Sequence, residues 1–366
     1  MRSSAEELDA VRDMAVAALA AWGAEPGEWR VVGVVPGSLG AELRPVVELD
    51  GARYLVRRQP AGLTASDTRA RHAFMRHLRA EGLPVPLVLP RPDGTTFAVV
   101  ADETYELQEW CAGERFRAAG DGATDQSAAA AACLGALHQA SAGFDGAPAR
   151  WSDERAPEAL ATSYLDLVRQ VAARDDITPA VAGAVERIAD GSGERIALAA
   201  EALAVVPGPP ELHLHGDYQP RNLAFAPEGS AIVTALYDFD AMHWGRRLDE
   251  VAYALLAFTG LRDDEDEPPA PLVEDGLDFA RADAFLQAYG RVAPPAEGEA
   301  PLLPDAIALL FPVVLANGVA EDLVFAEDYG GPPPEADILP RLHWAETFWL
   351  WLDRYRDTLA EAWARG

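Results

Sequence analysis

What this 366-residue sequence lacks sets the first limits on its function. It contains no lysine, so every basic side chain other than histidine is an arginine. The formal net charge is −29, the opposite of the balance needed to neutralise nucleic-acid phosphates, so we expect no nucleic-acid partner. An acidic field attracts cationic small molecules, but solubility alone also explains it. Composition leaves both interpretations open.

Cysteine and long apolar runs are scarce too. The two cysteines, Cys111 and Cys133, lack the paired spacing of a metal site and fit a reducing compartment. No stretch of about eighteen apolar residues occurs, so we expect no membrane span and no membrane partner. The charged N-terminal stretch MRSSAEELDAVRDM has no apolar signal core. Together these features predict a cytoplasmic protein.

Strand patterns dominate the first third of the sequence. Residues 29–60 contain three strand-like runs, and the second and third meet at the hairpin signal Asp50-Gly51. A helix is expected to begin near Ser66-Asp67 and to close at Gly82, and an earlier one covers residues 4–22. Two further short strands are expected in VPLVL and TFAVVA.

From about residue 125 helical patterns prevail, interrupted by LHLHGDYQPRNLAF and by IVTALYDFD. A chain of this length suits two lobes better than one core. We therefore predict a bilobal α+β architecture. Residues 1–108 form a small antiparallel-sheet lobe with a leading helix and one internal helix, and residues 109–366 form a larger helical lobe.

The stretch LHLHGDYQPRNLAF, at 212–225, carries more ionisable groups than a buried turn needs. His213 and His215 alternate along a strand, so they share one face and could chelate a metal together with Asp217. Alternatively, the polarity is that of an ordinary loop beside a buried histidine. The residues alone keep both possibilities open.

A third interpretation is phosphoryl transfer. That chemistry needs a carboxylate to orient or deprotonate the attacking hydroxyl, and oxygen ligands to hold Mg²⁺ against nucleotide phosphates. Asp217 and Asn222, five residues apart, supply a carboxylate and an amide oxygen. Asp238 follows the apolar run AIVTALY, at an interval that suits a β-hairpin returning the chain to the same place.

The order of these groups is specific. HGDYQPRN, followed by YDFDAMHWGRRLDEVAYAL, resembles the aminoglycoside phosphotransferase and choline kinase superfamily. Its pattern is HGD-x4-N, then D-[FWY]-[DE], then a helix that begins with D-[LE]-A. The N-terminal features fall in the same order, so the resemblance extends over nearly the whole chain. It implies a protein-kinase-like fold that transfers the γ-phosphate of ATP or GTP, with Mg²⁺, to a hydroxyl of a small molecule.

The resemblance also assigns roles in the catalytic loop. Asp217 is the catalytic base, and Asn222 and Asp238 are Mg²⁺ ligands with the oxygen donors that a hard cation prefers. Asp240 either reaches a second Mg²⁺ or supports the loop. His215 packs and hydrogen-bonds within the loop, which is a supporting role.

Asp249 matches the aspartate at the start of the following helix. The resemblance implies that it accepts backbone N–H bonds and so ties this helix to the catalytic loop. His213 has no family role and is expected to be a histidine of the strand core.

In the N-terminal lobe, Gly37, Ser38 and Gly40 lie where the family has its phosphate-covering turn, and glycine permits close approach of the backbone to phosphate. The family cation that holds the α- and β-phosphates corresponds to Arg57 in YLVRR. Arg58 is the alternative, because neighbouring strand residues face opposite sides. A planar guanidinium is not a point charge, so the usual geometry is in question.

One departure from the family is sharp. The helix after this strand usually carries a glutamate that pairs with the cation, but the matching position here is His72, and Asp67 is the nearest carboxylate. The sequence does not show what orients Arg57. The link YELQEWCAG is expected to pass the adenine, with backbone groups of the following residues as nucleotide contacts: Gln108, Glu109, Trp110 and Cys111.

The family acts on hydroxyls of antibiotics and metabolites, and this sequence does not single one out. We predict a sugar-containing antibiotic such as an aminoglycoside or a nucleoside as substrate, a class that includes cationic molecules. The alternatives are a primary metabolite (a sugar, choline or homoserine) and a pseudokinase-like module that binds nucleotide without transfer. The protein is expected to act as a monomer or a homodimer.

Overall fold

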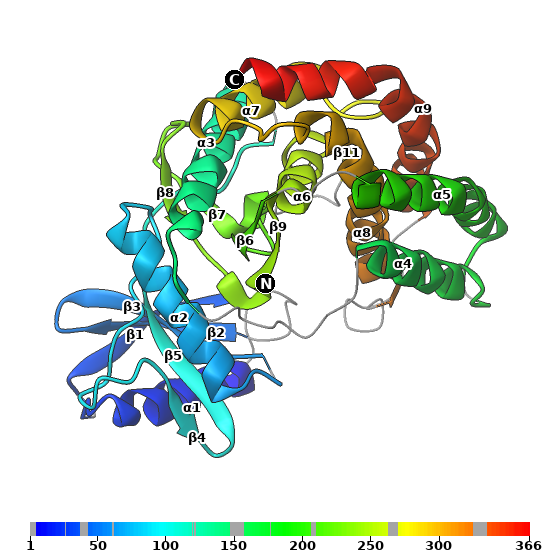
Figure 1. Ribbon diagram of the computed structural model, residues 1–366. Helices are drawn as coiled ribbons and strands as arrows, with labels where there is room; N and C mark the ends of the chain where they lie inside the picture. The colour runs from blue at the N-terminus through cyan, green and yellow to red at the C-terminus, as the bar shows by residue number, and fades with distance from the viewer. Residues whose placement is uncertain are drawn as a thin grey trace. The chain divides into compact units, whose positions relative to one another are not determined.

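The computed structural model describes most of the chain, namely residues 5–25, 27–36, 43–60, 62–118, 120, 122–146, 157–175, 177–205, 210–262, 270–324 and 335–366. The chain folds as two compact units (Figure 1). Unit 1 comprises Met1–Ala112, Phe144–Ala149 and Ala235–Asp240, and unit 2 comprises Gly113–Gly143, Arg150–Thr234 and Ala241–Gly366. Unit 1 therefore includes a late segment that carries Asp238 and Asp240. Within the described residues, no helix is both long and apolar enough to cross a membrane.

Unit 1 is built on a five-stranded antiparallel sheet with the strand order β1-β2-β3-β5-β4. Its elements are α1 (Ala5–Ala21), β1 (Trp29–Pro36), β2 (Leu43–Leu49), β3 (Ala52–Arg58), α2 (Ala65–Ala80), β4 (Ala98–Val100) and β5 (Glu103–Glu109). The predicted hairpin joins β2 to β3, and both Asp50 and Gly51 have positive φ, as its tight turn requires. VPLVL does not form the predicted strand. It makes one isolated bridge, from Val88 to Gln108, because its proline interrupts the ladder of donors.

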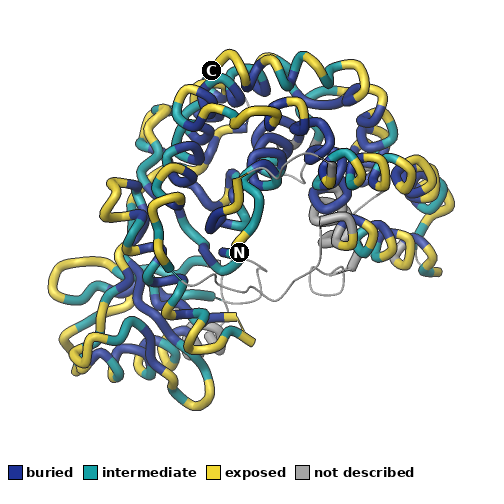
Figure 2. The backbone as a smooth tube through the Cα atoms, viewed as in Figure 1, coloured by how far each residue is buried: buried dark blue, intermediate teal, exposed yellow. Residues whose placement is uncertain are grey.

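The two faces of this sheet have different surroundings, one apolar and one charged. Val56 and Leu107 pack with Trp22 in the apolar cluster beneath α1, and Figure 2 shows the buried parts of these strands in dark blue. Side chains alternate along a strand, so the next residues, Arg57 and Glu106, point to the opposite face. On that face they meet α2. The alternation therefore separates an apolar core from a buried charged cluster.

Unit 2 is mainly helical. Its elements are α3 (Ala123–Ala142), α4 (Pro157–Ala172), α5 (Pro179–Val205), β6 (Glu211–Leu214), η1 (Pro220–Asn222), β7 (Leu223–Phe225), β8 (Val233–Leu236, which ends in unit 1), β9 (His243–Arg246), α6 (Arg247–Thr259), β10 (Leu261–Arg262), β11 (Ala270–Pro271), α7 (Phe279–Val292), η3 (Ala300–Leu302), α8 (Leu303–Val324) and α9 (Glu335–Arg365). The short η2 (Phe239–Ala241) begins in unit 1 and ends in unit 2.

A buried aromatic series connects the loop after β6 to the helices of unit 2. The ring of Tyr218 lies 6.0 Å from that of Phe258 on α6, and Phe258 lies 5.9 Å from Phe285 on α7. The Tyr218 hydroxyl donates to the Ala130 carbonyl of α3 at 2.7 Å. Because Tyr218 directly follows Asp217, this packing fixes the backbone at the predicted catalytic residue.

Candidate active site

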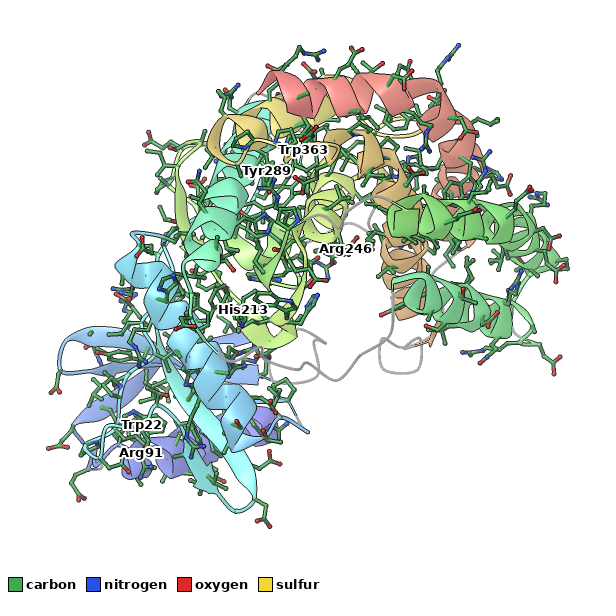
Figure 3. All side chains as sticks on the ribbon, in the orientation of Figure 1. Trp22, Arg91, His213, Arg246, Tyr289 and Trp363 are labelled. Atoms are coloured by element: carbon green, nitrogen blue, oxygen red, sulfur yellow. The ribbon has the colours of Figure 1, made fainter. Side chains whose placement is uncertain are left out.

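The loop after β6 is shaped by a glycine. β6 pairs antiparallel with β9, with Leu214 opposite His243, and Figure 3 labels His213 and Arg246 on this strand pair. The chain then turns at Gly216, whose φ of 85° lies in the left-handed region. A Cβ at this position would lie 1.9 Å from the carbonyl oxygen of Ala241, so the turn requires glycine.

Replacing Gly216 with alanine should collapse this turn. Gly51 provides a matched control, because its φ of 78° is similar but a Cβ there would meet nothing within 4 Å. Both variants carry the backbone cost of about 1–2 kcal/mol for a left-handed non-glycine residue. Only Gly216→Ala adds a clash, and displacing the loop by about 1 Å should lower catalytic turnover about a hundredfold. Equal activity in the two variants would contradict a role for this turn.

The carboxylate of Asp217 accepts hydrogen bonds from three side chains. The Gln219 amide donates to both oxygens at 2.8 Å, and the Asn222 amide donates to Oδ2 at 2.8 Å. The Tyr253 hydroxyl, from α6, donates to Oδ1 at 2.7 Å. These donors hold the carboxylate in one orientation, as a positioned general base requires. The sequence did not identify Gln219 and Tyr253 as hydrogen-bond donors to Asp217.

The η1 turn returns Asn222 to Asp217. The Asn222 backbone N–H donates to the Gln219 carbonyl at 3.0 Å. Its side-chain nitrogen donates to both the backbone carbonyl and the carboxylate of Asp217, each at 2.8 Å. Since the amide nitrogen is engaged, the amide oxygen is the atom that suits a hard cation.

Glu250 of α6 ties this helix to the loop. Its Oε1 accepts from the Gly216 N–H at 2.6 Å and its Oε2 from the His215 N–H at 3.3 Å. His138 Nε2 lies 2.8 Å from Oε2. Burial raises the pKa of Glu250, but the hydrogen bond and charge of His138 and the charge of His215 outweigh it, so the pKa falls below its usual value.

The sequence assigned that anchoring to the neighbouring Asp249. Asp249 forms a bidentate ion pair with Arg246, at 2.9 and 3.0 Å, and its predicted backbone contacts stay a prediction. Adjacent helical residues point in directions about 100° apart, so a shift of one position moves a carboxylate off the face that meets the loop. The anchoring residue is Glu250, and it shares that face with Tyr253 three residues later.

The two histidines of the stretch at 212–225 are both buried. His215 is fully buried, and its Nδ1 accepts from the Asp217 N–H at 3.2 Å, while its supporting role stays a prediction. His213 is also buried, with its ring edge against Trp244 at 5.0 Å. Among the described residues, no group of three or more histidine, cysteine, aspartate or glutamate side chains is arranged to hold a metal ion.

Unit 1 contains a second cluster, centred on Arg57. This side chain is 2% exposed and donates to Glu106 at 3.2 Å, to Asp238 at 2.7 Å and to both oxygens of Asp240. Burial lowers the pKa of Arg57, but the three carboxylates outweigh it and raise the pKa well above its usual value. Arg58 lies apart, in an exposed pair with Glu103 at 3.4 Å.

Glu106, on β5, takes the place of the missing helix glutamate. Arg57 and Glu106 are directly opposed in the β3–β5 register. Asp67 instead caps α2, where its carboxylate accepts from the Thr64 N–H at 2.9 Å. His72, at the family's glutamate position, also turns to Glu106, with its Nε2 2.7 Å from Oε2. Arg57 is thus held by a carboxylate of the neighbouring strand.

Asp238 stands in a strained backbone conformation, with φ of 60°. Left-handed non-glycine residues are uncommon and cluster at functional sites. Asp240, two residues later, has both carboxylate oxygens engaged by arginines, Oδ1 by Arg57 and Arg71 and Oδ2 by Arg57. Asp240 therefore has a loop-supporting contact in this structure, one of its two predicted possibilities.

The predicted adenine-side link already makes several contacts. The Glu109 N–H donates to the Leu87 carbonyl at 2.8 Å, and the Trp110 N–H donates to the Arg53 carbonyl at 2.9 Å. The Cys111 carbonyl accepts from Tyr237 at 2.8 Å. The side chain of Gln108 donates to Glu106 at 2.6 Å. The phosphate-covering turn, Gly37, Ser38 and Gly40, lies outside the described residues, so both nucleotide-binding assignments stay predictions.

Asp238 and Asn222 each carry an oxygen donor of a type that suits a hard divalent cation. Asp238 offers a carboxylate and Asn222 an amide oxygen, the ligand types that Mg²⁺ prefers. These two residues belong to different units. Their joint use of one metal is therefore part of the functional proposal below.

Comparison with known proteins shows the family to which this protein belongs. The model of the phosphotransferase enzyme family matches residues 38–297, more than half of the chain, and the protein belongs to that family. This confirms the predicted resemblance. Among curated proteins, none matches the sequence significantly.

Solved structures confirm the protein-kinase-like α+β fold. An aminoglycoside phosphotransferase from Alicyclobacillus acidocaldarius is 14% identical, with a TM-score of 0.61 over 95% of this chain and 94% of its own. A microcompartment-associated aminopropanol kinase is 14% identical, with a TM-score of 0.63 over 90% and 93%. A spectinomycin phosphotransferase in complex with ADP and spectinomycin is 10% identical, with a TM-score of 0.58 over 98% and 99%. At these identities the likeness shows the fold alone.

Proposed function

We propose that this phosphotransferase moves the γ-phosphate of ATP or GTP to a hydroxyl of a small molecule, with Asp217 as the base. One observation carries the proposal. The carboxylate of Asp217 is held by three donors, and one of these is Asn222, the family's metal ligand, at 2.8 Å. A base and a metal ligand in contact within one loop are what phosphoryl transfer requires.

In the proposed step the acceptor hydroxyl attacks the γ-phosphorus and the bond to the β–γ bridging oxygen breaks, so ADP or GDP leaves. Asp217 orients the hydroxyl and takes its proton late in the transfer, because a carboxylate is a weak base. Asn222 and Asp238 would hold Mg²⁺, which when bound neutralises charge on the phosphate oxygens. Asp240 is the further candidate ligand, although its arginine contacts favour the supporting role.

The relatives favour a small acceptor. The spectinomycin phosphotransferase supports an antibiotic of the aminoglycoside, nucleoside or other sugar-containing type. So does an amicoumacin kinase in complex with AMP-PNP and Ca²⁺, which has a TM-score of 0.55 and 15% identity over 98% of this chain and 96% of its own. Its AMP-PNP and the ADP of the spectinomycin enzyme favour ATP as the phosphate donor. The aminopropanol kinase supports the alternative, a kinase of a small metabolite.

The proposal is tested by incubating the protein with Mg²⁺, ATP or GTP and a library of hydroxylated antibiotics and metabolites. We expect at least one compound to gain the mass of one phosphate. Nucleotide binding without acceptor-dependent ADP or GDP release would favour the third possibility, a nucleotide-binding module without transfer.

A further inference from the structure

Glu106 is the centre of a buried cluster that the proposed transfer does not use directly. Its side chain is fully buried, and its two oxygens face five side-chain partners: Arg57, Gln108, Gln59, Arg71 and His72. Burial raises the pKa of Glu106, but the charges of Arg71, His72 and Arg57 lower it well below its usual value. A buried carboxylate with this many donors fixes the positions of its partners.

Two of those partners, Arg57 and Arg71, also contact the same second carboxylate. Arg57 and Arg71 each have one guanidinium edge on Glu106 and donate to Asp240 as well. The Arg71 bond to Glu106 measures 2.6 Å. Arg71 is 4% exposed, and its buried Nε has no hydrogen-bond partner among the described residues. Glu106 therefore aims two cations, from β3 and α2, at the Asp238–Asp240 segment.

Carboxylates outnumber guanidiniums in this cluster. Three carboxylates, Glu106, Asp238 and Asp240, face two guanidiniums within unit 1. If Asp238 binds Mg²⁺, the Arg57 Nη2 group that donates to it becomes available to another anion, and Arg71 lies beside Arg57 on Asp240. The phosphates that accompany the metal are such anions. Guanidinium forks also match phosphate oxygens in pairs, which one ammonium group does not do.

We propose that Arg71 is a second phosphate-binding residue, which acts with Arg57 on the phosphates of the nucleotide, and that Glu106 positions both. This inference rests on the proposed nucleotide-dependent function. It assigns a cation to the helix on which relatives of this fold are expected to carry the pairing glutamate. Compared with the family pattern, the carboxylate lies on β5 in this structure, and α2 carries an additional positive charge.

The test measures binding without turnover. The unchanged protein and Arg71→Gln are titrated with Mg²⁺ and a non-hydrolysable ATP or GTP analogue, and separately with the corresponding nucleoside. Arg76→Gln is the matched control, because Arg76 is an exposed arginine of the same helix. Arg57→Gln is the reference for a phosphate cation. Thermal unfolding of each variant checks that it is folded.

We expect Arg71→Gln to weaken binding of the triphosphate analogue about 10- to 100-fold, as loss of a charge-assisted hydrogen bond does, and to leave nucleoside binding unchanged. Arg76→Gln should bind both normally. Arg71→Lys keeps the charge and loses the fork, so it should fall between the unchanged protein and Arg71→Gln, and it serves as the test if Arg71→Gln does not fold.

Two results would overturn the inference alone. One is unchanged analogue binding by folded Arg71→Gln, and the other is an equal loss for nucleoside and triphosphate, which would make Arg71 purely structural. Failure of the unchanged protein to bind any nucleotide would overturn the proposed function together with this inference.

Discussion

Replacing Asp217 with alanine should lower the rate of phosphate transfer by about 10²- to 10⁴-fold, the usual contribution of a positioned general base, and leave nucleotide binding largely intact. The reason is local. In the proposed step Asp217 orients the acceptor hydroxyl, whereas the cluster around Arg57 belongs to the other unit. The effect is measured as acceptor-dependent ADP or GDP release, alongside titration with a non-hydrolysable analogue.

Tyr253→Phe is the graded comparison for Asp217→Ala. It keeps the carboxylate and removes one donor, the hydroxyl at 2.7 Å from Oδ1. Loss of a hydrogen bond to a charged group costs about 1.5–3 kcal/mol, so we expect a smaller loss of turnover, from about tenfold upward. Substantial residual turnover in Asp217→Ala would remove this residue as the base.

Replacing Asp238 with asparagine should raise the Mg²⁺ concentration needed for nucleotide binding and lower transfer at least about a hundredfold. A metal supplies several kcal/mol of charge stabilisation in the transition state, and an amide is a weaker ligand than a carboxylate. Asparagine is preferred to alanine here because φ at Asp238 is 60°, a conformation that asparagine tolerates better. The measurement is a Mg²⁺ titration of nucleotide binding and of turnover.

Asp240→Asn is the matched control for Asp238→Asn. Its carboxylate is held by Arg57 and Arg71, so we expect a largely unchanged Mg²⁺ midpoint. An unchanged midpoint in Asp238→Asn would contradict its assignment as a ligand. An equal shift in both variants would make Asp240 a ligand as well.

The fold was predictable because its signals are local. The hairpin at Asp50-Gly51 depends on two adjacent residues that both adopt positive φ. The catalytic loop is likewise compact: Asp217, Gln219 and Asn222 hydrogen-bond within six positions. Sequence spacing therefore predicts a shared loop, and the structure brings these residues together as that spacing implies.

The partner of Arg57 was not predictable, because it depends on a pairing between distant strands. Arg57 and Glu106 are 49 positions apart, with α2 and β4 between them, and only the β3–β5 register places them opposite each other. A partial signal was present in YELQEW. Tyr105 and Leu107 alternate with Glu106 and Gln108, so a glutamate had to share the face of a strand with other polar groups.

Glu250, which hydrogen-bonds to the loop after β6, was not singled out for a different reason. Asp249 and Glu250 are adjacent carboxylates at a helix start, and a family pattern alone does not fix the rotation of that helix. The buried residues of α6 do fix it: Glu250 is 4% exposed, whereas Asp249 is half-buried and paired with Arg246. Rotation about a helix is set by packing, which one motif does not specify.

The most direct test of phosphate transfer with Asp217 as the base follows the terminal phosphate itself. ATP or GTP labelled with ¹⁸O in the γ-phosphate is incubated with the unchanged protein, Mg²⁺ and an acceptor from the compound library, and products are read by mass spectrometry. We predict that the label appears as a phosphoester on the acceptor, and that Asp217→Ala, while still binding nucleotide, does not form it. Label that remains in the nucleotide or appears only as free phosphate with every acceptor, or an Asp217→Ala variant that phosphorylates at the unchanged rate, would contradict this function.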